Sequence, residues 1–161
     1  MQGRLISALI GLVLLSALAG VVLFINRGSH MELQGQIKKV RTVELDEKSS
    51  LIVVDFHVNN PADYKFMVKQ VDVKVDADGS VLDGTTVAEL DARRIFEYYK
   101  QLGPKFNDTF KPRDVLPAKQ AGDYMIAAQF NIPEAKLAAR KALTVTIREA
   151  DGQVTDLKES R

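Results

Sequence analysis

Between residues 33 and 161, apolar and polar side chains alternate in short runs, the pattern of β-strands that bury one face. The clearest run lies between residues 51 and 60. Its alternate residues Ile52, Val54, Phe56 and Val58 are apolar and point to one face of the strand. The other parity includes Asp55 and His57, which we therefore expect to face solvent. Pro61 has no backbone N–H to donate to a neighbouring strand, so this strand must end near Asn60.

The rest of this region reads as further strands. We expect them at residues 33–45, 66–76, 80–88, 114–116, 124–132 and 142–159, the last as a hairpin that turns at Asp151-Gly152. Lys39 and Arg41 interrupt the apolar parity of the first, which indicates a twisted or bulged edge strand. Phe66 and Val68 have the opposite parity to the following valines, which predicts a bulge near Lys69.

The period changes to that of a helix at residues 88–102, where apolar residues recur every three to four positions. Phe96 and Tyr99 are expected to pack on the strands while Tyr98 stays outside. Thr86 and Glu89 have the spacing of a capping box, and Gly103-Pro104 should end the helix. About seven strands with hairpin signals and one helix predict a mainly β fold, an antiparallel β-sandwich.

The N-terminal part of the chain has a different character. Residues 5–26 carry no charge, and residues 5–25 are long enough as a helix to cross a lipid bilayer. This indicates one N-terminal transmembrane helix within an anchor at residues 1–27. A cleaved signal peptide is the alternative, because Ala17-Leu18-Ala19 resembles a cleavage site.

Residues 28–31, Gly-Ser-His-Met, form a short tether that resembles the remnant of an expression tag, so His30 is left out of every site argument. The sandwich domain is expected at residues 32–161. A short N-terminal tail before one span usually stays in the cytoplasm. We therefore expect a single-pass membrane protein whose C-terminal domain lies outside the cytoplasm, periplasmic or extracellular.

The net charge of the domain bears on which partners it can bind. Removing Arg4 and Arg27 from the 22 basic residues leaves 20 against 21 acidic residues, so the domain carries about −1. A run of phosphates needs a basic excess, and this speaks against nucleic-acid binding. The chain has no cysteine, which excludes a lipid-modified cysteine and a disulfide framework.

The residues that carry chemistry form no convincing site. Asp76 and Asp78 before Gly79 resemble the opening of a calcium loop, but Val87 stands where the bidentate glutamate is needed, so a hairpin turn is expected. The triplet Asn107-Asp108-Thr109 matches the N-glycosylation acceptor pattern. No catalytic, cofactor-binding or metal-binding residue is predicted, and an enzyme that uses Asp55 and His57 is the least favoured reading.

The strand that ends in Asn-Pro, followed by a strand with alternating valines, resembles the late-embryogenesis-abundant group 2 family, also called the water-stress and hypersensitive-response domain. The matching residues are Phe56, Val58, Asn60, Pro61, Val71, Val73 and Val75. The family often has asparagine at the third position of an Asn-Pro-Asn triplet, where this chain has Ala62. The resemblance implies a fibronectin-III-like sandwich with a helix at one end and no catalytic residues.

Two functional hypotheses follow. The first is a membrane-anchored, non-enzymatic domain that protects the cell envelope during desiccation or water stress, with the lipid bilayer as a partner through residues 5–25. The second is an interaction subunit of an envelope protein assembly, which would use a strand edge or the connector at residues 106–117. No small-molecule substrate and no cofactor is expected in either case. Asn59 and Asn60 are expected to satisfy backbone groups where the strand stops.

Overall fold

The computed structural model describes residues 11, 13, 15–21, 32–77 and 79–159. The chain divides into two compact units, Met1–Met31 and Glu32–Arg161. In the first unit, the described residues are helical, whereas most of the predicted anchor and all of the tether lie outside the described residues. Within the described part of the chain, no helix has the length and apolar character needed to span a membrane.

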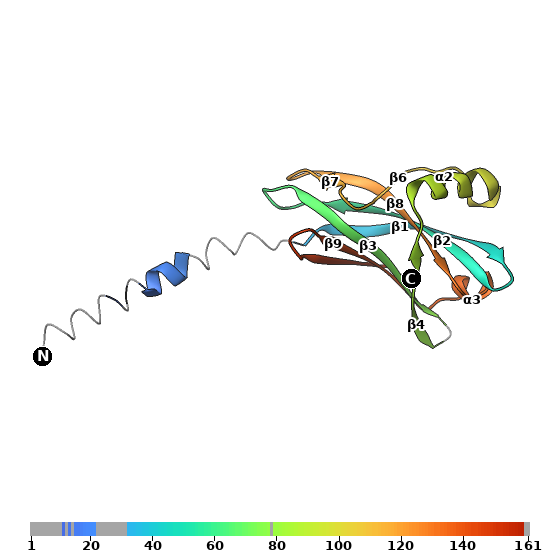
Figure 1. The fold of residues 1–161 in the computed structure, drawn as a ribbon, viewed down its shortest axis with the longest axis horizontal. Helices are drawn as coiled ribbons and strands as arrows, with labels where there is room; N and C mark the ends of the chain where they lie inside the picture. Colours follow the sequence, from blue (N-terminus) through green and yellow to red (C-terminus); the bar gives the residue numbers. More distant parts are fainter. Residues whose placement is uncertain (1–10, 12, 14, 22–31, 78, 160–161) are drawn as a thin grey trace, which may run out of the picture. The chain divides into compact units, whose positions relative to one another are not determined.

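The second unit is a β-sandwich of two sheets (Figure 1). In the first sheet, the order is β1 (Gln34–Asp46), β2 (Ser49–Asn59), β8 (Ala121–Phe130) and β5 (Thr85–Thr86), with β6 (Asp108–Thr109) also beside β8. In the second sheet, the order is β10 (Val154–Lys158), β9 (Ala142–Glu149), β3 (Phe66–Ala77) and β4 (Ser80–Asp83), with β7 (Val115–Leu116) also beside β3. The predicted mainly β class is thus confirmed.

The count of elements differs from the prediction. Glu32–Glu159 without residue 78 contains ten strands, of which seven have four or more residues, and β5, β6 and β7 have two each. Three helices are present in place of one: α2 (Glu89–Tyr98), the 3-10 helix η1 (Lys100–Leu102) and the short α3 (Glu134–Ala138). The sheets are antiparallel except where β6 runs parallel to β8.

The main core lies between the two sheets. The predicted inward residues of β2 are buried there, together with the valines of β3 and the apolar residues of β9. Phe56 from β2 meets Phe110 edge-on, with ring centroids 5.9 Å apart. The two-residue period of a strand places alternate side chains on one face, which is why the sequence pattern identified these core residues.

The predicted irregularities are confirmed. The pairing of β3 with β9 shifts register between Val68 and Gln70, which lets Phe66 and Val68 join Val71 in the core despite their opposite parity. β1 forms the outer edge of the first sheet and shifts register twice against β2, once on each side of Val40. Such bulges twist an edge strand and discourage it from pairing with another chain.

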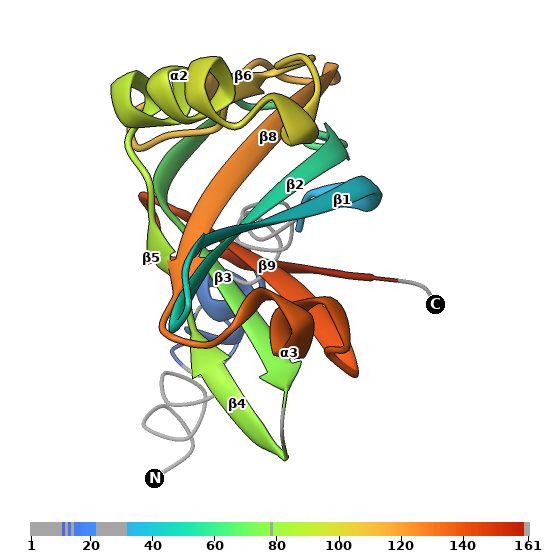
Figure 2. The ribbon, with the colours of Figure 1, turned by 90° about the vertical axis from the view of Figure 1, so that its right-hand side faces the viewer.

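A second, smaller core lies on the outer face of the first sheet. There α2 and η1 cover Leu51 and Val53 of β2 and Met125 of β8 (Figure 2). Phe96 is buried in this core, whereas Tyr98 is 77% exposed. The strand β2 is consequently buried on both faces, which the alternation of its residues alone does not predict.

The ends of α2 differ from the prediction. The capping box does not form: Ala88 is the N-cap residue without a side-chain cap, Thr86 lies in β5, and Glu89 pairs with Lys111. The helix ends at Tyr98, before the predicted stop at residue 103, because Tyr99 leaves the helical region with φ −93° and ψ 80°. The chain then continues as η1.

Candidate functional site

The residues behind the family resemblance meet where β2 ends. The side chain of Asn60 is 1% exposed. Its amide nitrogen donates to the backbone carbonyls of Tyr64, Leu116 and Pro117 at 2.7, 3.2 and 3.1 Å, and its amide oxygen accepts from the backbone N–H of Ala62 at 3.0 Å. One side chain thus bonds four backbone groups in two loops, with the two hydrogens of its amide nitrogen shared among three carbonyls. We call this arrangement the Asn60 junction.

The backbone completes the Asn60 junction. The N–H of Asn60 donates to the carbonyl of Gln120 at 2.8 Å, and the N–H of Lys119 donates to the carbonyl of Ala62 at 3.2 Å. The Lys119 ammonium also donates to the carbonyl of Pro61 at 2.6 Å. Because Pro61 ends the β2 ladder, these bonds hold the chain where strand pairing stops. This is a structural role.

The other residues of the matching motif lie in the main core. Phe56 and Val58 come from β2, and Val71, Val73 and Val75 come from β3, all less than 5% exposed. Ala62, at the third position of the triplet, is also buried, at 1%. Of the seven motif residues, only Asn60 and Pro61 are brought together with the loops at this end of the sandwich. The motif therefore forms a packing unit and a strand terminus.

The prediction for Asp55 was wrong. Asp55 is 4% exposed and lies on the outer face of β2 beside the core under α2. Its Oδ2 accepts from Arg41 Nη2 at 2.6 Å and its Oδ1 accepts from Asn107 Nδ2 at 2.9 Å. Both carboxylate oxygens are thus occupied. A charge in this position needs such partners, because removal from water is costly for an unpaired carboxylate.

Arg41 connects the Asp55 carboxylate to the segment after α2. Its Nη1 donates to the backbone carbonyls of Leu102 and Pro104 at 2.7 and 2.9 Å. Its guanidinium also lies over the rings of Phe96 and Phe106, 5.0 and 5.2 Å from their centroids. Arg41 was assigned by sequence only to an irregular edge strand. In the structure it joins β1, β2 and the loop after η1.

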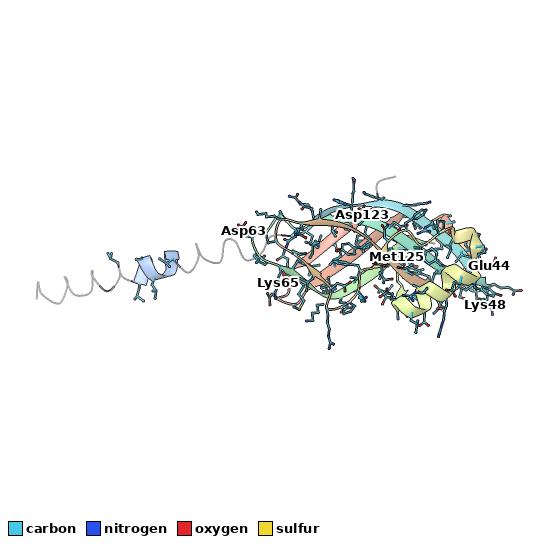
Figure 3. All side chains as sticks on the ribbon, turned by 90° about the horizontal axis from the view of Figure 1, so that it is seen from above. Glu44, Lys48, Asp63, Lys65, Asp123 and Met125 are labelled. Atoms are coloured by element: carbon cyan, nitrogen blue, oxygen red, sulfur yellow. The ribbon has the colours of Figure 1, made fainter. Side chains whose placement is uncertain are left out.

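His57 lies further along the same face and is only partly exposed. Its Nδ1 is 2.7 Å from Asp123 Oδ1 on the neighbouring strand β8, and Lys38 Nζ lies 3.1 Å from the same oxygen. Figure 3 shows Asp123 on the strand that also carries Met125. In the described part of the chain, no hydroxyl is hydrogen-bonded to His57. Sequence analysis missed Asp123 because its partner stands 66 residues away.

The pKa of the Asp123 carboxyl lies below its ordinary value, first because His57 hydrogen-bonds to it and second because Lys38 does. A carboxyl whose pKa is lowered by folding stabilises the fold above its ordinary pKa of about 3.9. That contribution is lost as the pH falls through the lowered pKa of the folded state. The lowered pKa of Asp123 therefore contributes to stability at neutral pH, and this contribution is lost in acid.

We expect His57→Ala to raise the pKa of Asp123 toward its ordinary value, because the first cause of its lowering is removed. Lys38→Ala should raise it less. An NMR titration of the Asp123 side-chain carbon measures both. Lys39→Ala is the control, because its ammonium lies over the Phe106 ring and contacts no carboxylate in the described structure. An Asp123 titration unchanged by His57→Ala would contradict this assignment.

Several hollows on the domain bear on ligand binding. One of about 510 Å³ lies over the outer face of the second sheet. One of about 290 Å³ lies between Val71, Phe110 and the start of α2, and another of about 270 Å³ lies beside Phe106, Lys38 and Asp123. Among the described residues, no three His, Asp or Glu side chains are placed to hold a metal ion.

The structure also shows the surroundings of the glycosylation triplet and of the loop that resembles a calcium site. Asn107, of the glycosylation triplet, is half-buried and bound to Asp55. In the loop that resembled a calcium site, Asp78 lies outside the described residues, but Ala77 pairs with Ser80 and Gly79 has a φ of 77°. That geometry is the expected tight hairpin turn, and positive φ suits glycine.

Comparisons with known proteins leave the family open. No family model matches the chain, and no curated protein matches it. Among solved structures it is similar to a target of the Northeast Structural Genomics Consortium, with a TM-score of 0.40 and 9% identity over 80% of this chain and 83% of that one. It is also similar to a protein from Archaeoglobus fulgidus, with a TM-score of 0.41 and 10% identity over 77% and 93%.

A third similar structure is a flagellar-like filament, with a TM-score of 0.37 and 10% identity over 96% of this chain and 97% of that one. At these TM-scores and identities, the three likenesses assign no function.

Proposed function

We propose that this chain is a membrane-anchored, non-enzymatic domain that protects components of the cell envelope during desiccation or water stress. In this proposal residues 5–25 hold it in the bilayer, and the sandwich is a fibronectin-III-like member of the late-embryogenesis-abundant group 2 family outside the cytoplasm. The supporting observations come from the sandwich, because it contains every residue of the matching motif.

The observation that carries the proposal is the Asn60 junction. The resemblance rests on a strand that stops at Asn-Pro, and here the asparagine bonds four buried or partly buried backbone groups at that stop. A stop built with this many bonds fixes the loops at one end of the sandwich. Asp63 and Lys65 mark this end in Figure 3, opposite the hairpin at Glu44 and Lys48.

Protection would operate through the exterior of the folded domain. Its surface carries many partly exposed ion pairs, such as Lys74 with Asp83 at 3.1 Å and Lys119 with Asp63 at 3.1 Å. Such pairs contribute little to stability, so their groups remain able to hydrogen-bond to a drying membrane or protein. A rigid domain offers these groups without the ordering cost that a disordered chain has to meet.

A drying assay tests the proposal. A labile enzyme is dried with residues 32–161 and rehydrated, and its recovered activity is compared with an equal mass of an unrelated β-sandwich. We expect clear excess protection at low molar ratio. An Asn60→Ala fragment, measured above its own unfolding midpoint, should lose the excess because the folded exterior is lost. Protection equal to the unrelated sandwich would overturn the proposal.

The anchor has a separate test. The full chain should fractionate with membranes, and a chain that lacks residues 1–27 should appear folded in the soluble fraction. A cysteine introduced at Glu47 in the exposed β1–β2 turn should react with an impermeant maleimide from outside the cytoplasm, since the chain has no other cysteine. Labelling that occurs only after lysis would contradict the proposed topology and place the domain in the cytoplasm.

A second function, an interaction subunit of an envelope assembly, is favoured by the connector after η1. Phe106 is 58% exposed and Val115 is 42% exposed, although large apolar side chains are usually covered when no partner needs them. A stable partner that copurifies with the full chain and is lost with Phe106→Ser would support this function. Retention of that partner in the variant would exclude the connector as its docking site.

A further inference from the structure

The outer face of the second sheet has its charges sorted into rows. β3 and β10 both pair antiparallel to β9, so they run in the same direction on either side of it. Thr144 of β9 lies between Lys74 and Lys158, and Thr146 lies between Asp72 and Asp156. The face thus carries a basic row (Lys74, Thr144, Lys158) beside an acidic row (Asp72, Thr146, Asp156).

The two rows come from a repeated sequence pattern. Asp72-Val73-Lys74 in β3 and Asp156-Leu157-Lys158 in β10 each place an aspartate and a lysine two residues apart, on the outer face, around a buried apolar residue. The register places the two lysines at one level of the sheet and the two aspartates at another, with β9 between them. A threonine of β9 separates the like charges within each row, and Asp83 of β4 lies opposite Lys74 at the edge of the basic row.

This face is open. A hollow of about 510 Å³ lies over it, and α2 packs on the other sheet. Asp156 and Lys158 are exposed, and Asp72 and Lys74 are partly exposed. Val81 and Val154 border the hollow with 67% and 37% of their surface exposed. The apolar borders and the sorted charges both suit a covered surface better than a solvated one.

Present contacts of the two rows are weak enough to be exchanged. Lys74 lies 3.1 Å from Asp83, and Arg148 lies 3.5 Å from Asp72, in pairs that are all partly or largely exposed. Asp156 accepts a hydrogen bond from Thr146 within its own row at 2.7 Å. Exposed ion pairs of this kind add little to stability, so a partner that covers them can take over these charges.

We propose that the outer face of the second sheet docks on the same face of a second copy of this chain. The two-fold axis lies in the plane of the interface, across the strands and between the two rows. Rotation about it sets each basic row against an acidic row. Lys74 then faces Asp72 of the other copy, Lys158 faces its Asp156, and Thr144 faces its Thr146. Each contact occurs twice, as in any isologous interface.

Charge complementarity selects this occupant. The face carries three basic residues, Lys74, Arg148 and Lys158, against four acidic ones, Asp72, Asp76, Asp83 and Asp156, and so has a net charge of about −1. Nucleic acid and anionic bilayers need a basic excess. A surface with no basic excess and with separated basic and acidic rows fits a partner whose rows have the same separation in the opposite order. A second copy of this chain has both properties.

Charge reversal tests this pairing in the full chain in detergent. Lys74→Glu with Lys158→Glu makes both rows acidic, and Asp72→Lys with Asp156→Lys makes both rows basic. Each variant alone should self-associate at least tenfold more weakly than the unchanged chain, because like charges then face each other. An equimolar mixture of the two should regain association, because each acidic face meets a basic one. Rising salt should weaken both complexes.

Labelling makes the mixture measurable. Because the chain has no cysteine, a cysteine at Glu47, away from this face, accepts a donor dye in one variant and an acceptor dye in the other. Energy transfer then reports the mixed dimer, and sedimentation reports each variant alone. The matched control reverses Lys48 and Lys100, both exposed and off this face, and should associate like the unchanged chain. Circular dichroism checks that each variant is folded.

The results separate this proposal from others. Weakened association in each variant and its recovery in the mixture support the paired rows. A monomeric unchanged chain, association that both reversals leave intact, or a mixture that stays monomeric would each overturn them. Association that both reversals leave intact is also the result expected if dimers are held through the N-terminal segment. The proposal does not rest on stress protection, and the drying assay can fail without affecting it.

Discussion

Replacing Asn60 by alanine should lower the free energy of unfolding by about 3–4 kcal/mol, since it leaves the buried Leu116 carbonyl and Ala62 N–H without this partner, and each such group costs about 1–3 kcal/mol. The change removes the only side chain that bonds the carbonyls of Tyr64, Leu116 and Pro117 and the N–H of Ala62 among the described contacts. Water that enters the new space offsets part of this cost. The total free energy of unfolding of a domain of this size is only about 5–15 kcal/mol.

Urea unfolding of residues 32–161, followed by circular dichroism, measures the loss. Asn59→Ala is the matched control, because Asn59 is half-buried at the end of β2 and pairs there through its backbone with Gln34 and Ala121. It should cost less than about 1 kcal/mol. If the two alanine variants unfold at the same urea concentration, the Asn60 junction does not stabilise the fold as described.

Asp55→Ala should lower the free energy of unfolding by about 3–5 kcal/mol, which is the usual effect of removing one partner from a buried ion pair. The side chains of Arg41 and Asp55 are only 9% and 5% exposed. Without the carboxylate, the Arg41 guanidinium stays buried with an uncompensated charge, and Asn107 loses its acceptor. The same urea experiment applies. His57→Ala, two residues along the same face and partly exposed, should cost less than about 1 kcal/mol.

A double variant separates the pair from its burial. Arg41→Met with Asp55→Leu removes both charges and fills the space with apolar atoms, so its cost should be well below the sum of the two single changes. Buried pairs replaced in this way are often close to neutral. A double-mutant cycle gives the coupling directly. Costs that simply add would mean that Arg41 and Asp55 act independently, in conflict with the 2.6 Å contact between them.

Local pattern was a good guide to the sandwich. The inward parity of β2, the bulge near Lys69, the short strand at Val115–Leu116 and the final hairpin follow from residues that are neighbours in sequence. A strand repeats every two residues and a bulge shifts that repeat by one. Both signals are therefore visible without knowing which strands pair. The candidate residues Asn60 and Pro61 were found in the same way, from the chemistry of a strand stop.

Contacts between distant segments were not accessible in this way. The burial of Asp55 depends on Arg41, on Asn107 and on the α2–η1 segment, which is supplied by residues 89–102. One signal was present, because Leu51–Val54 is a continuous apolar run and such runs are typical of strands buried on both faces. Nothing in the sequence names Asp123 as the partner of His57, because that contact follows from the pairing of β2 with β8.

The amino-acid sequence alone determined the longer strands, the parity that faces the main core and where β2 must stop, because steric and hydrogen-bonding limits act between near neighbours. It did not show that residues 80–88 divide into β4 and β5 in different sheets, or that Asp108–Thr109 forms β6. Only the tertiary structure decided which strands lie side by side. That choice buries Asp55 under a distant segment, and it places the Asp-x-Lys pairs of β3 and β10 in register across β9. Strand order is fixed by the packing of the whole core, to which residues far apart in the chain contribute together.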